Sequence, residues 1–292
     1  MKQRTLGKTR LRAAVLGYGA MELRDPGRVS DREADRLLGA VLDGGINFID
    51  TSPDYGVSED RIGKYLCHRR SDYVLATKCG CNVDDRGTGR EPRHVWTREQ
   101  LLRNIEQSLR RLRTDHVDIW QLHGARVEDV DGAGLLEVMH EVKATGKARH
   151  VSISSTLPDI RTYVLRRAFA TYQIPYSALQ REHELVIREV AAAGAGVIIR
   201  GGVAKGEHST RMVNRWKLWE TCNLDEFLAE GESRSGFLLR LTITHPGMHT
   251  TIVGTSNPQH LAENLAAAER GTVREDTYAE IQRRLTGAGE HP

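Results

Sequence analysis

Short apolar runs alternate with longer amphipathic segments along almost the whole chain. An apolar run of about four to eight residues between turn signals is typical of a buried strand, whereas apolar residues three or four positions apart are typical of a helix packed on a sheet. The pattern predicts eight strands, at residues 13–17, 46–50, 73–77, 117–122, 150–153, 171–174, 196–199 and 249–253.

A helix is predicted after each of these strands. Two helix starts carry capping signals, Ser30 before the first helix and Thr97, followed by Gln100, before the third. Such a hydroxyl can accept a hydrogen bond from a free backbone N–H of the first turn. The predicted helices span residues 31–43, 58–67, 97–113, 134–144, 157–169, 182–193, 225–242 and 258–269, and a ninth follows at 273–285. Residues 80–96 and 201–224 are predicted as long connections.

Eight βα units in sequence predict an α/β fold, and specifically a closed (β/α)8, or TIM, barrel rather than an open doubly wound sheet. Residues 2–12 predict a short N-terminal β-hairpin that turns at Gly7-Lys8 and could close one end of the barrel. No change of composition and no Pro- or Ser-rich linker marks a boundary, so we expect a single domain, 1–292, with the ninth helix as an addition.

Composition narrows the class of protein. Hydrophobic residues make up 39% and charged residues 28%, which is typical of a globular protein with a large core. Lys and Arg number 42 against 39 Asp and Glu, and the resulting net charge of +3 is too small to indicate a nucleic-acid partner. No run approaches the roughly 18 to 20 apolar residues of a membrane span, so no membrane association is expected. The oligomeric state stays open.

The four cysteines are irregularly spaced, and the first residues lack the apolar segment of a secretory signal. These features predict a reducing, cytoplasmic compartment. Cys79 and Cys81 are too close together for a typical zinc-ribbon or redox motif, and there is no second pair. The predicted strand ends show no cluster of metal ligands either, so no metal site is expected.

Four ionisable residues lie at or just beyond the ends of three consecutive predicted strands: Asp50 and Tyr55 in GINFIDTSPDYG, Lys78 in VLATKCG and His123 in VDIWQLHG. In a barrel, the carboxyl ends of all strands meet at one mouth, where function is concentrated. Each residue alone has an ordinary explanation, such as an Asx-type turn, a surface lysine or a packed histidine. Their joint placement favours a catalytic site.

The four groups suit proton transfer to a carbonyl. A tyrosine has a pKa of about 10, so a nearby cation is expected to lower its pKa before it can act as an acid. Lys78 could supply this charge, and Asp50 would keep the lysine charged and fixed in place. His123 could point a carbonyl oxygen at Tyr55. Such a site protonates a developing alkoxide, and the hydride must come from a cofactor.

With these residues in place, the chain resembles the aldo-keto reductase family. The resemblance rests on blocks in the family's order and spacing: NFIDTSPDYG followed by Glu59, ATK at 76–78, VDIWQLH at 117–123, GKARHVSIS at 146–154 and TTIVGTSNPQHLAEN at 250–264. It covers nearly the whole chain, and all four members of the family's Asp-Tyr-Lys-His set have a matching position. It implies a barrel that binds NADPH without a Rossmann domain. Consistently, GYGAME at 17–22 lacks the last glycine of G-x-G-x-x-G.

The resemblance also implies where the nicotinamide end of the cofactor binds. Ser154 matches a serine that bonds the carboxamide, but Ser155 replaces the usual asparagine and offers only a hydroxyl. Alternatively, these serines could simply cap the next helix. The positions matched to this end of the cofactor are Gly19, Ala20, Met21, Asp50, Ser154, Ser155 and Gln173.

Residues after the seventh predicted strand match those that cover the nicotinamide and the pyrophosphate. Arg200 stands where many family members stack an aromatic ring, and a guanidinium plane can stack there too. Lys205 would bring charge to the pyrophosphate, although it could equally be a solvated loop lysine. The matched positions are Arg200, Gly201, Gly202, Val203, Lys205 and Gly206.

The start of the last barrel helix matches the family's site for the adenosine 2′-phosphate, where hydroxyls and helix-start amides would face the anion. The basic pair of better-known members is replaced by Gly254 and His260. Because histidine is only partly cationic near neutrality, this weakens the preference for NADPH over NADH. An ordinary capped helix is the alternative. The matched positions are Gly254, Thr255, Ser256 and His260, with Glu263 and Asn264 against the adenine.

We therefore predict reversible reduction of an aldehyde or ketone with NADP(H), or with NAD(H). The pocket for this carbonyl substrate is expected to include Met21, Trp96 and residues 211–219 with Trp216 and Trp219, because loops over a barrel mouth select the substrate. A sensor or regulatory subunit that binds the cofactor without turnover is the alternative, although a pure binder has no use for a tuned phenol. A metal-dependent hydrolase or isomerase would need a ligand cluster that the sequence does not display.

Overall fold

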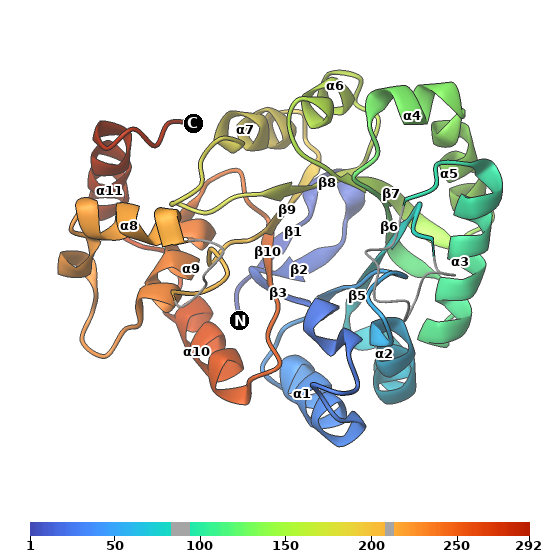
Figure 1. Cartoon of the computed structure of the whole chain (residues 1–292), viewed down its shortest axis with the longest axis horizontal. Coiled ribbons are helices and arrows are strands. Elements are labelled where there is room, and N and C mark those ends of the chain that lie inside the picture. Colours follow the sequence, from blue (N-terminus) through green and yellow to red (C-terminus); the bar gives the residue numbers. More distant parts are fainter. Residues whose placement is uncertain (83–93, 208–212) are drawn as a thin grey trace.

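The computed structural model describes residues 1–82, 94–207 and 213–292. In this part of the chain, parallel strands form a closed barrel (Figure 1). The strands follow one another around the barrel in chain order, and β10 closes it by pairing with β3. They are β3 (Leu16–Gly19), β4 (Phe48–Asp50), β5 (Val74–Cys79), β6 (Val117–His123), β7 (Ala148–Ser154), β8 (Thr171–Pro175), β9 (Gly196–Arg200) and β10 (Thr250–Val253). The predicted (β/α)8 barrel is confirmed.

The first barrel strand begins later than the sequence predicts. An antiparallel hairpin precedes the barrel, formed by β1 (Gln3–Thr5) and β2 (Arg12–Ala14) on either side of the 3-10 helix η1 (Gly7–Thr9). Ala13 pairs with Arg4 in this hairpin, whereas the pattern assigns residue 13 to the barrel. The apolar run continues without interruption across β2 and β3, so it does not mark the break between them.

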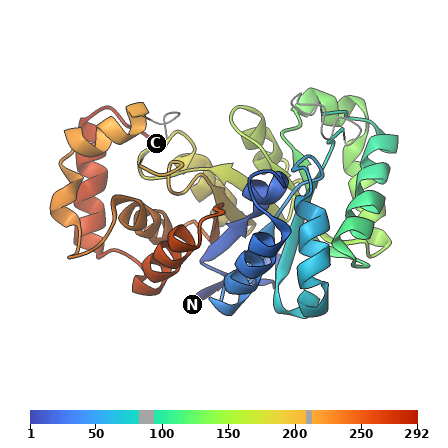
Figure 2. The same cartoon turned by 60° about the horizontal axis from the view of Figure 1, so that its bottom comes forward.

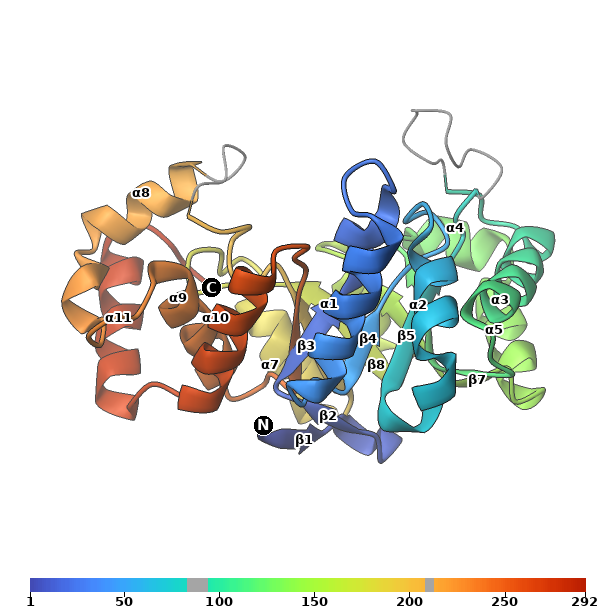
Figure 3. The ribbon, with the colours of Figure 1, turned by 90° about the horizontal axis from the view of Figure 1, so that it is seen from below.

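The hairpin lies across the amino-terminal ends of the barrel strands (Figure 3). Leu6 is fully buried there, in one apolar cluster with Phe48 and Ile198. Gly7 has a φ of 54°, and a Cβ on it would lie 2.4 Å from the backbone nitrogen of Gly196. A side chain at this position would therefore force the hairpin away from the barrel. The predicted closure of one barrel end is confirmed.

Helices surround the barrel on the outside (Figure 2). The strands between them are buried on both faces, and all six residues of β5 are buried. Ser30 and Thr97 cap α1 and α3 as predicted, because each side chain accepts a hydrogen bond from a backbone N–H of the first turn. The helices that follow the barrel strands are α1 (Asp31–Asp43), α2 (Ser58–Leu66), α3 (Arg98–Leu112), α5 (Leu135–Ala144), α6 (Asp159–Leu165), α7 (Glu184–Ala192), α9 (Arg234–Thr244) and α10 (Pro258–Arg270).

Short helices that the pattern does not predict occupy several connections. They are η2 (Ala20–Arg24) after β3, η3 (Cys67–Asp72) after α2 and α4 (Val127–Gly132) after β6. No helix in the three described ranges is long and apolar enough to cross a bilayer.

Two further helices lie beside the barrel (Figures 1 and 3). The predicted connection 201–224 contains α8 (Val213–Thr221), the predicted helix 225–242 is divided into η5 (Leu224–Phe227) and α9, and the chain ends with α11 (Glu275–Gly287). These elements share a second apolar cluster, in which Trp219 packs edge-on against Phe237 with ring centroids 6.1 Å apart. Only Trp216 and Trp219 of α8 are buried, so the sequence shows no apolar stripe that would predict this helix.

Candidate active site

The four predicted catalytic residues converge at the carboxyl ends of β4, β5 and β6. Asp50 ends β4, Lys78 is the penultimate residue of β5, His123 ends β6, and Tyr55 lies in the loop after β4. The Lys78 Nζ lies 2.6 Å from Asp50 Oδ2 and 5.0 Å from the centroid of the Tyr55 ring. The rings of Tyr55 and His123 are 6.1 Å apart and nearly perpendicular, at 80°. The structure thus brings the whole predicted set together.

Both carboxylate oxygens of Asp50 are hydrogen-bonded in a closed network. Oδ2 accepts from Lys78, while Oδ1 accepts from Gln121 Nε2 at 2.8 Å and from Gln173 Nε2 at 3.0 Å. Lys78 also donates to the carbonyl of Thr51 at 2.8 Å. Asp50 and Lys78 are each only 1% exposed, and an ion pair this deeply buried needs such complete pairing.

Two glutamines therefore have roles that the sequence does not assign. Gln121 is not among the predicted site residues, yet it lies two positions before His123 on β6. Because side chains alternate along a strand, this spacing places both on the same face and was the available signal. Gln173 is predicted to bond the nicotinamide carboxamide, but its Nε2 donates to Asp50, which leaves Oε1 for a further contact.

Burial raises the pKa of Tyr55, and the positive charge of Lys78 offsets this only in part. Lys78 therefore acts in the predicted direction, but burial outweighs it, and the pKa of Tyr55 stays above its ordinary value. Burial alone would lower the pKa of Lys78, but the charge and hydrogen bond of Asp50, with a contribution from Tyr55, outweigh burial and hold that pKa above its ordinary value. At neutral pH, Lys78 is a permanent cation and Tyr55 keeps its proton.

The Nδ1 side of His123 faces a second cluster of polar groups. Asp54 Oδ2 lies 3.3 Å from His123 Nδ1, and Cys81 Sγ lies 3.5 Å from it. His94 Nε2 lies 3.5 Å from the same Asp54 oxygen. One potential ligand atom from each of these four residues lies within 4.8 Å of the others. The expectation that the strand ends carry no such cluster is wrong.

The members of this cluster come from three separate segments. Asp54 precedes Tyr55, His123 ends β6, and Cys81 and His94 oppose each other in an isolated antiparallel bridge. Burial alone would raise the pKa of Asp54, but the neighbouring imidazoles outweigh it and hold that pKa below its ordinary value. Burial lowers the pKa of His123, so this ring is mostly neutral near pH 7.

The residues predicted at the nicotinamide end border the catalytic centre. Gly19 is the register partner of Asp50 between β3 and β4, and Ser154 is the partner of Gln173 between β7 and β8. Ser154 and Ser155 are buried. Neither caps the next helix, because α6 has Pro158 as its N-cap and no side-chain cap bond. The alternative role of these serines is therefore excluded.

Arg200 ends β9 and approaches the same centre. Burial lowers the pKa of Arg200, and electrostatic interactions with Tyr55 and Asp50 oppose this effect. Behind Arg200 the chain packs closely on β10, because a Cβ on Gly202 would lie 2.5 Å from Thr251 Oγ1. Glycine allows this close approach.

The loop after β9 has space and charge for a phosphate group. Ala204, Lys205 and Gly206 have φ values of 46°, 59° and 82°, and turns of this kind can form concave backbone surfaces that favour anions. A Cβ on Gly201 or Gly206 would meet no atom within 4 Å, so the space beside them is open. Lys205 is exposed at this turn, and Val203 is partly buried. These residues fit the pyrophosphate of a dinucleotide.

The turn between β10 and α10 lies against the end of β3, where a Cβ on Gly254 would be 2.7 Å from the carbonyl oxygen of Gly19. Asn257 caps α10 by accepting from the Gln259 N–H, and Thr255 Oγ1 accepts from the Asn257 N–H at 3.0 Å. The chain itself thus uses some of the predicted phosphate donors. The exposed predicted positions here are Gly254, Ser256, His260 and Glu263, and the buried ones are Thr255 and Asn264.

The predicted substrate-pocket walls fall into two groups. Met21, beside Ala20 in η2, is 37% exposed, and the Trp96 ring packs so closely on Gly80 that a Cβ there would lie 2.0 Å from it. Trp96 also contacts His94, with ring centroids 5.5 Å apart, which places it near the mouth. The two tryptophans of α8 are instead buried in the second apolar cluster, so their assignment to the pocket is wrong. Residues 211–212 and the part of the predicted loop at 83–93 lie outside the described ranges.

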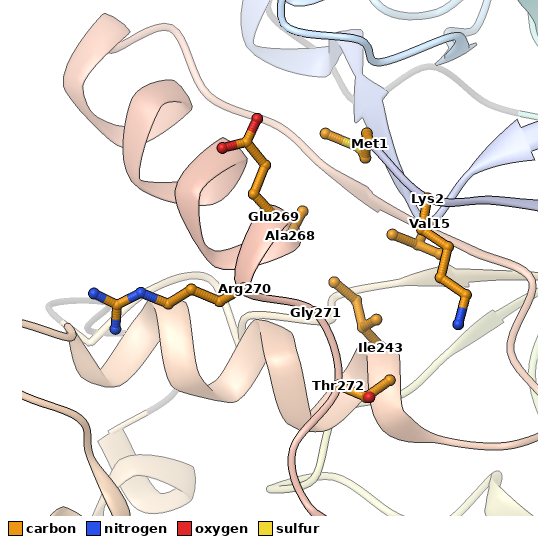
Figure 4. Close-up of a pocket in the computed structure, with 9 residues that line it drawn as sticks. All are labelled: Met1, Lys2, Val15, Ile243, Ala268, Glu269, Arg270, Gly271 and Thr272. Carbon is orange, nitrogen blue, oxygen red and sulfur yellow. The ribbon is translucent and has the colours of Figure 1, made fainter.

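A separate pocket of about 390 Å³ lies at the amino-terminal end of the barrel (Figure 4). Met1 and Lys2 line it, together with Val15, which precedes β3, and Gly271, which follows α10. The catalytic residues lie at the other end of the strands. This pocket is therefore not part of the candidate site.

Known proteins are similar to this chain in sequence and in fold. The profile of the Aldo/keto reductase family matches residues 15–285. The uncharacterized oxidoreductase YqkF of Bacillus subtilis (strain 168) is 28% identical, over 97% of this chain and 96% of its own length. L-galactose dehydrogenase of Arabidopsis thaliana is 27% identical, over 96% and 92%. Among solved structures, the holo form of aldo-keto reductase AKR11C1 from Bacillus halodurans has a TM-score of 0.84 and 30% identity, covering 97% of this chain and 96% of that chain.

The family profile over most of the chain and the 30% identical solved structure over 97% of it define the class of protein as a nicotinamide-dependent oxidoreductase. The chain belongs to the aldo-keto reductase family. Carbonyl reduction is its reaction class.

Proposed function

We propose that this protein reduces an aldehyde or ketone to an alcohol with NADPH, and that Tyr55 donates the proton. The position of Lys78 carries the proposal. Its ammonium group is held by Asp50 and by the Thr51 carbonyl, 5.0 Å from the centroid of the Tyr55 ring. A fixed positive charge beside a phenol stabilises the phenolate that remains after proton donation.

Tyr55 begins the reaction with its proton in place, because burial holds the pKa of this phenol above its ordinary value. An alkoxide that develops on the substrate is a much stronger base than a phenolate, so the proton moves from Tyr55 Oη to the substrate oxygen. Lys78 is already charged and fixed before this step, so the site needs little reorganisation as charge develops.

His123 is proposed to orient the substrate oxygen. Its Nδ1 side faces Asp54 and Cys81, so Nε2 is the ring nitrogen left for the substrate. The ring is mostly neutral near pH 7, because burial lowers its pKa. A proton on Nε2 lets the neutral ring donate to the carbonyl oxygen and hold it near Tyr55.

A bound nicotinamide cofactor supplies the hydride. The ends of β3, β7, β8 and β9 would hold its nicotinamide end, and the turn at 201–206 would hold the pyrophosphate. We propose a preference for NADPH over NADH because Thr255, Ser256 and His260 put two hydroxyls and an imidazole at the start of α10, where an added phosphate would lie. His260 and Ser256 are exposed and free to turn towards it.

We further propose that the whole chain forms one domain and works in the cytoplasm. Helix α9 supports the first point, because it packs on the barrel through Leu239 and Ile243 and on the second cluster through Phe237. All four cysteines are free thiols, which supports a reducing compartment.

Fluorescence titration with NADPH and with NADH, followed by loss of nicotinamide absorbance with a panel of aldehydes and ketones, tests the proposal. The reverse reaction is run with L-galactose, because the Arabidopsis relative is an L-galactose dehydrogenase. We expect turnover of at least one carbonyl and tighter binding of NADPH. Equal affinity for the two cofactors contradicts the NADPH preference. Cofactor binding without turnover of any substrate favours the sensor alternative.

A further inference from the structure

The cluster of Asp54, Cys81, His94 and His123 has a composition that proton transfer to a carbonyl does not require. It combines a carboxylate, a thiol and two imidazoles, and these are the ligand types of four-coordinate zinc sites. From its geometry and its unsatisfied carboxylate oxygen, we propose that this protein binds one zinc-like divalent ion through these four side chains.

The distances fit the edges of a zinc tetrahedron. With Zn–N and Zn–O bonds of about 2.0–2.1 Å and a Zn–S bond of about 2.3 Å, two N or O ligands lie about 3.3–3.4 Å apart, and S and N lie about 3.5 Å apart. Asp54 Oδ2 lies 3.3 Å from His123 Nδ1 and 3.5 Å from His94 Nε2. Cys81 Sγ lies 3.5 Å from His123 Nδ1. No pair of the four ligand atoms is more than 4.8 Å apart.

As hydrogen bonds alone, these contacts leave Asp54 poorly satisfied. A charge-assisted N–H···O bond is about 2.7–2.9 Å long, whereas both imidazole contacts of Asp54 are longer, at 3.3 and 3.5 Å. Its other oxygen, Oδ1, is buried and has no hydrogen-bond partner in the described parts of the chain, and the side chain is only 9% exposed. Leaving a buried carboxylate oxygen without a partner costs free energy, and a bound cation would offset this cost.

The ligands are held on a firm backbone. The N–H of Cys81 donates to Asn104 Oδ1 at 3.0 Å, and its carbonyl accepts from Asn104 Nδ2 at 2.9 Å and from Gln100 Nε2 at 2.6 Å. His94 opposes Cys81 in the antiparallel bridge. Helix α3 thus fixes one ligand directly and the other through its pairing, which is the support that a metal site needs.

The donor set selects the ion. Magnesium and calcium prefer oxygen ligands, whereas a thiolate with two imidazoles favours zinc. On binding, the Cys81 thiol loses its proton to solvent as the sulfur–metal bond forms. The thiolate and the Asp54 carboxylate then carry two negative charges, which balance the divalent ion.

The ion would also position His123. Without a metal, the Asp54 carboxylate favours the proton on Nδ1 of the neutral ring, and Nε2 is then an acceptor. With the ion on Nδ1, the proton lies on Nε2, which is the tautomer that can donate to a carbonyl oxygen. The metal would thus act on the reduction through His123.

Cobalt substitution tests the site independently of activity. Protein stripped with a chelator is titrated with Co²⁺ and then with Zn²⁺, while the visible and near-ultraviolet spectra are recorded. We expect one equivalent of Co²⁺ to give the intense visible bands of a tetrahedral site and a thiolate-to-cobalt band, both of which Zn²⁺ removes. Absence of the thiolate band overturns the proposal.

Three variants locate the ligands. Cys81→Ala and His94→Gln should each weaken Zn²⁺ affinity by more than about 100-fold, since losing even an outer-shell partner costs about 10–100-fold. Cys222→Ala, which removes a buried thiol from the second apolar cluster, is the matched control and should bind normally. Circular dichroism checks that each variant is folded. If Cys81→Ala does not fold, His94→Gln decides, because its side chain is 32% exposed. Unchanged affinity in a folded ligand variant, or equal loss in the control, contradicts the proposal.

The positioning role has its own readout. Removing the ion should lower kcat for carbonyl reduction and leave NADPH affinity unchanged, and adding Zn²⁺ should restore the rate. An unchanged kcat in metal-free protein overturns this role for the ion.

Discussion

Two aspartates four residues apart, Asp50 at the end of β4 and Asp54 in the loop that follows, have opposite surroundings. Asp50 makes hydrogen bonds of 2.6 to 3.0 Å through both oxygens, to a lysine and two glutamines. Asp54 makes contacts of 3.3 and 3.5 Å to two imidazoles through one oxygen, while the other oxygen is buried without a partner among the described residues.

The Asp50 network is closed, because both carboxylate oxygens have hydrogen-bond partners. The Asp54 cluster is open, because one carboxylate oxygen has no partner among the described residues. Lys78 keeps its charge at neutral pH, so the Asp50 network has a single charge state and can act as a fixed electrostatic support for Tyr55. The cluster around Asp54 contains two imidazoles and a thiol, whose protons can be replaced by a metal ion. The end of β4 thus supplies a permanent part of the site, and the loop after it supplies a part suited to binding a ligand.

The largest effect is expected from Lys78→Met, which breaks the closed network. The variant leaves the Asp50 carboxylate buried without its cation, so the free energy of unfolding should fall by about 3–5 kcal/mol. Urea unfolding at pH 7 measures this. In the control, Asp50→Asn combined with Lys78→Met, the buried charge is absent and the loss should be smaller. A double variant that is as unstable as the single one contradicts the closed network.

A smaller effect is expected from Gln121→Leu, which removes one of the two donors to Asp50 Oδ1. Loss of a bond to a buried carboxylate should lower the free energy of unfolding by about 1–3 kcal/mol. Gln173→Leu is the matched variant, because it removes the other donor to the same oxygen. If neither variant changes stability, the two amides do not support Asp50.

The smallest effect is expected from Asp54→Asn in metal-free protein, because both imidazole contacts of Asp54 are long, at 3.3 and 3.5 Å. We expect a loss of about 1 kcal/mol at pH 7. The pKa of Asp54 lies below its ordinary value of 3.8 in the folded state. Its ionised form therefore contributes stability in full above that value, and the contribution is lost as the pH falls through the lowered pKa. The free energies of unfolding of the variant and of the unaltered protein should therefore converge as the pH falls from 7 to 2. A stability difference between the two proteins that grows as the pH falls contradicts the claim that ionised Asp54 stabilises the fold.

The barrel and the Asp50–Lys78 pair of the closed network were predictable because both depend on local patterns. Apolar runs mark the strands, and the carboxyl ends of parallel strands meet at one mouth, so Asp50, Lys78 and His123 could be placed together from their positions alone. Gln121 was also predictable, because it lies two residues before His123 on β6 and side chains two apart on a strand share a face.

The open cluster could not be predicted in this way. It depends on the pairing of Cys81 with His94, which follows no period in the sequence. Helix α8 was missed because only two tryptophans of it are buried, and these pack in a second cluster instead of lining the substrate pocket. The raised pKa of Tyr55 also depends on the degree of burial, which spacing does not reveal.

Replacement of Tyr55 by phenylalanine tests the central claim most directly, because it removes the phenolic oxygen and leaves the ring beside Lys78. NADPH affinity and carbonyl turnover are measured on the same preparation. We expect affinity within about twofold of the unaltered protein and turnover lowered by about 10²–10⁴-fold, the usual contribution of a general acid. A Tyr55→Phe protein that binds NADPH and keeps nearly full turnover would contradict the claim that Tyr55 donates the proton.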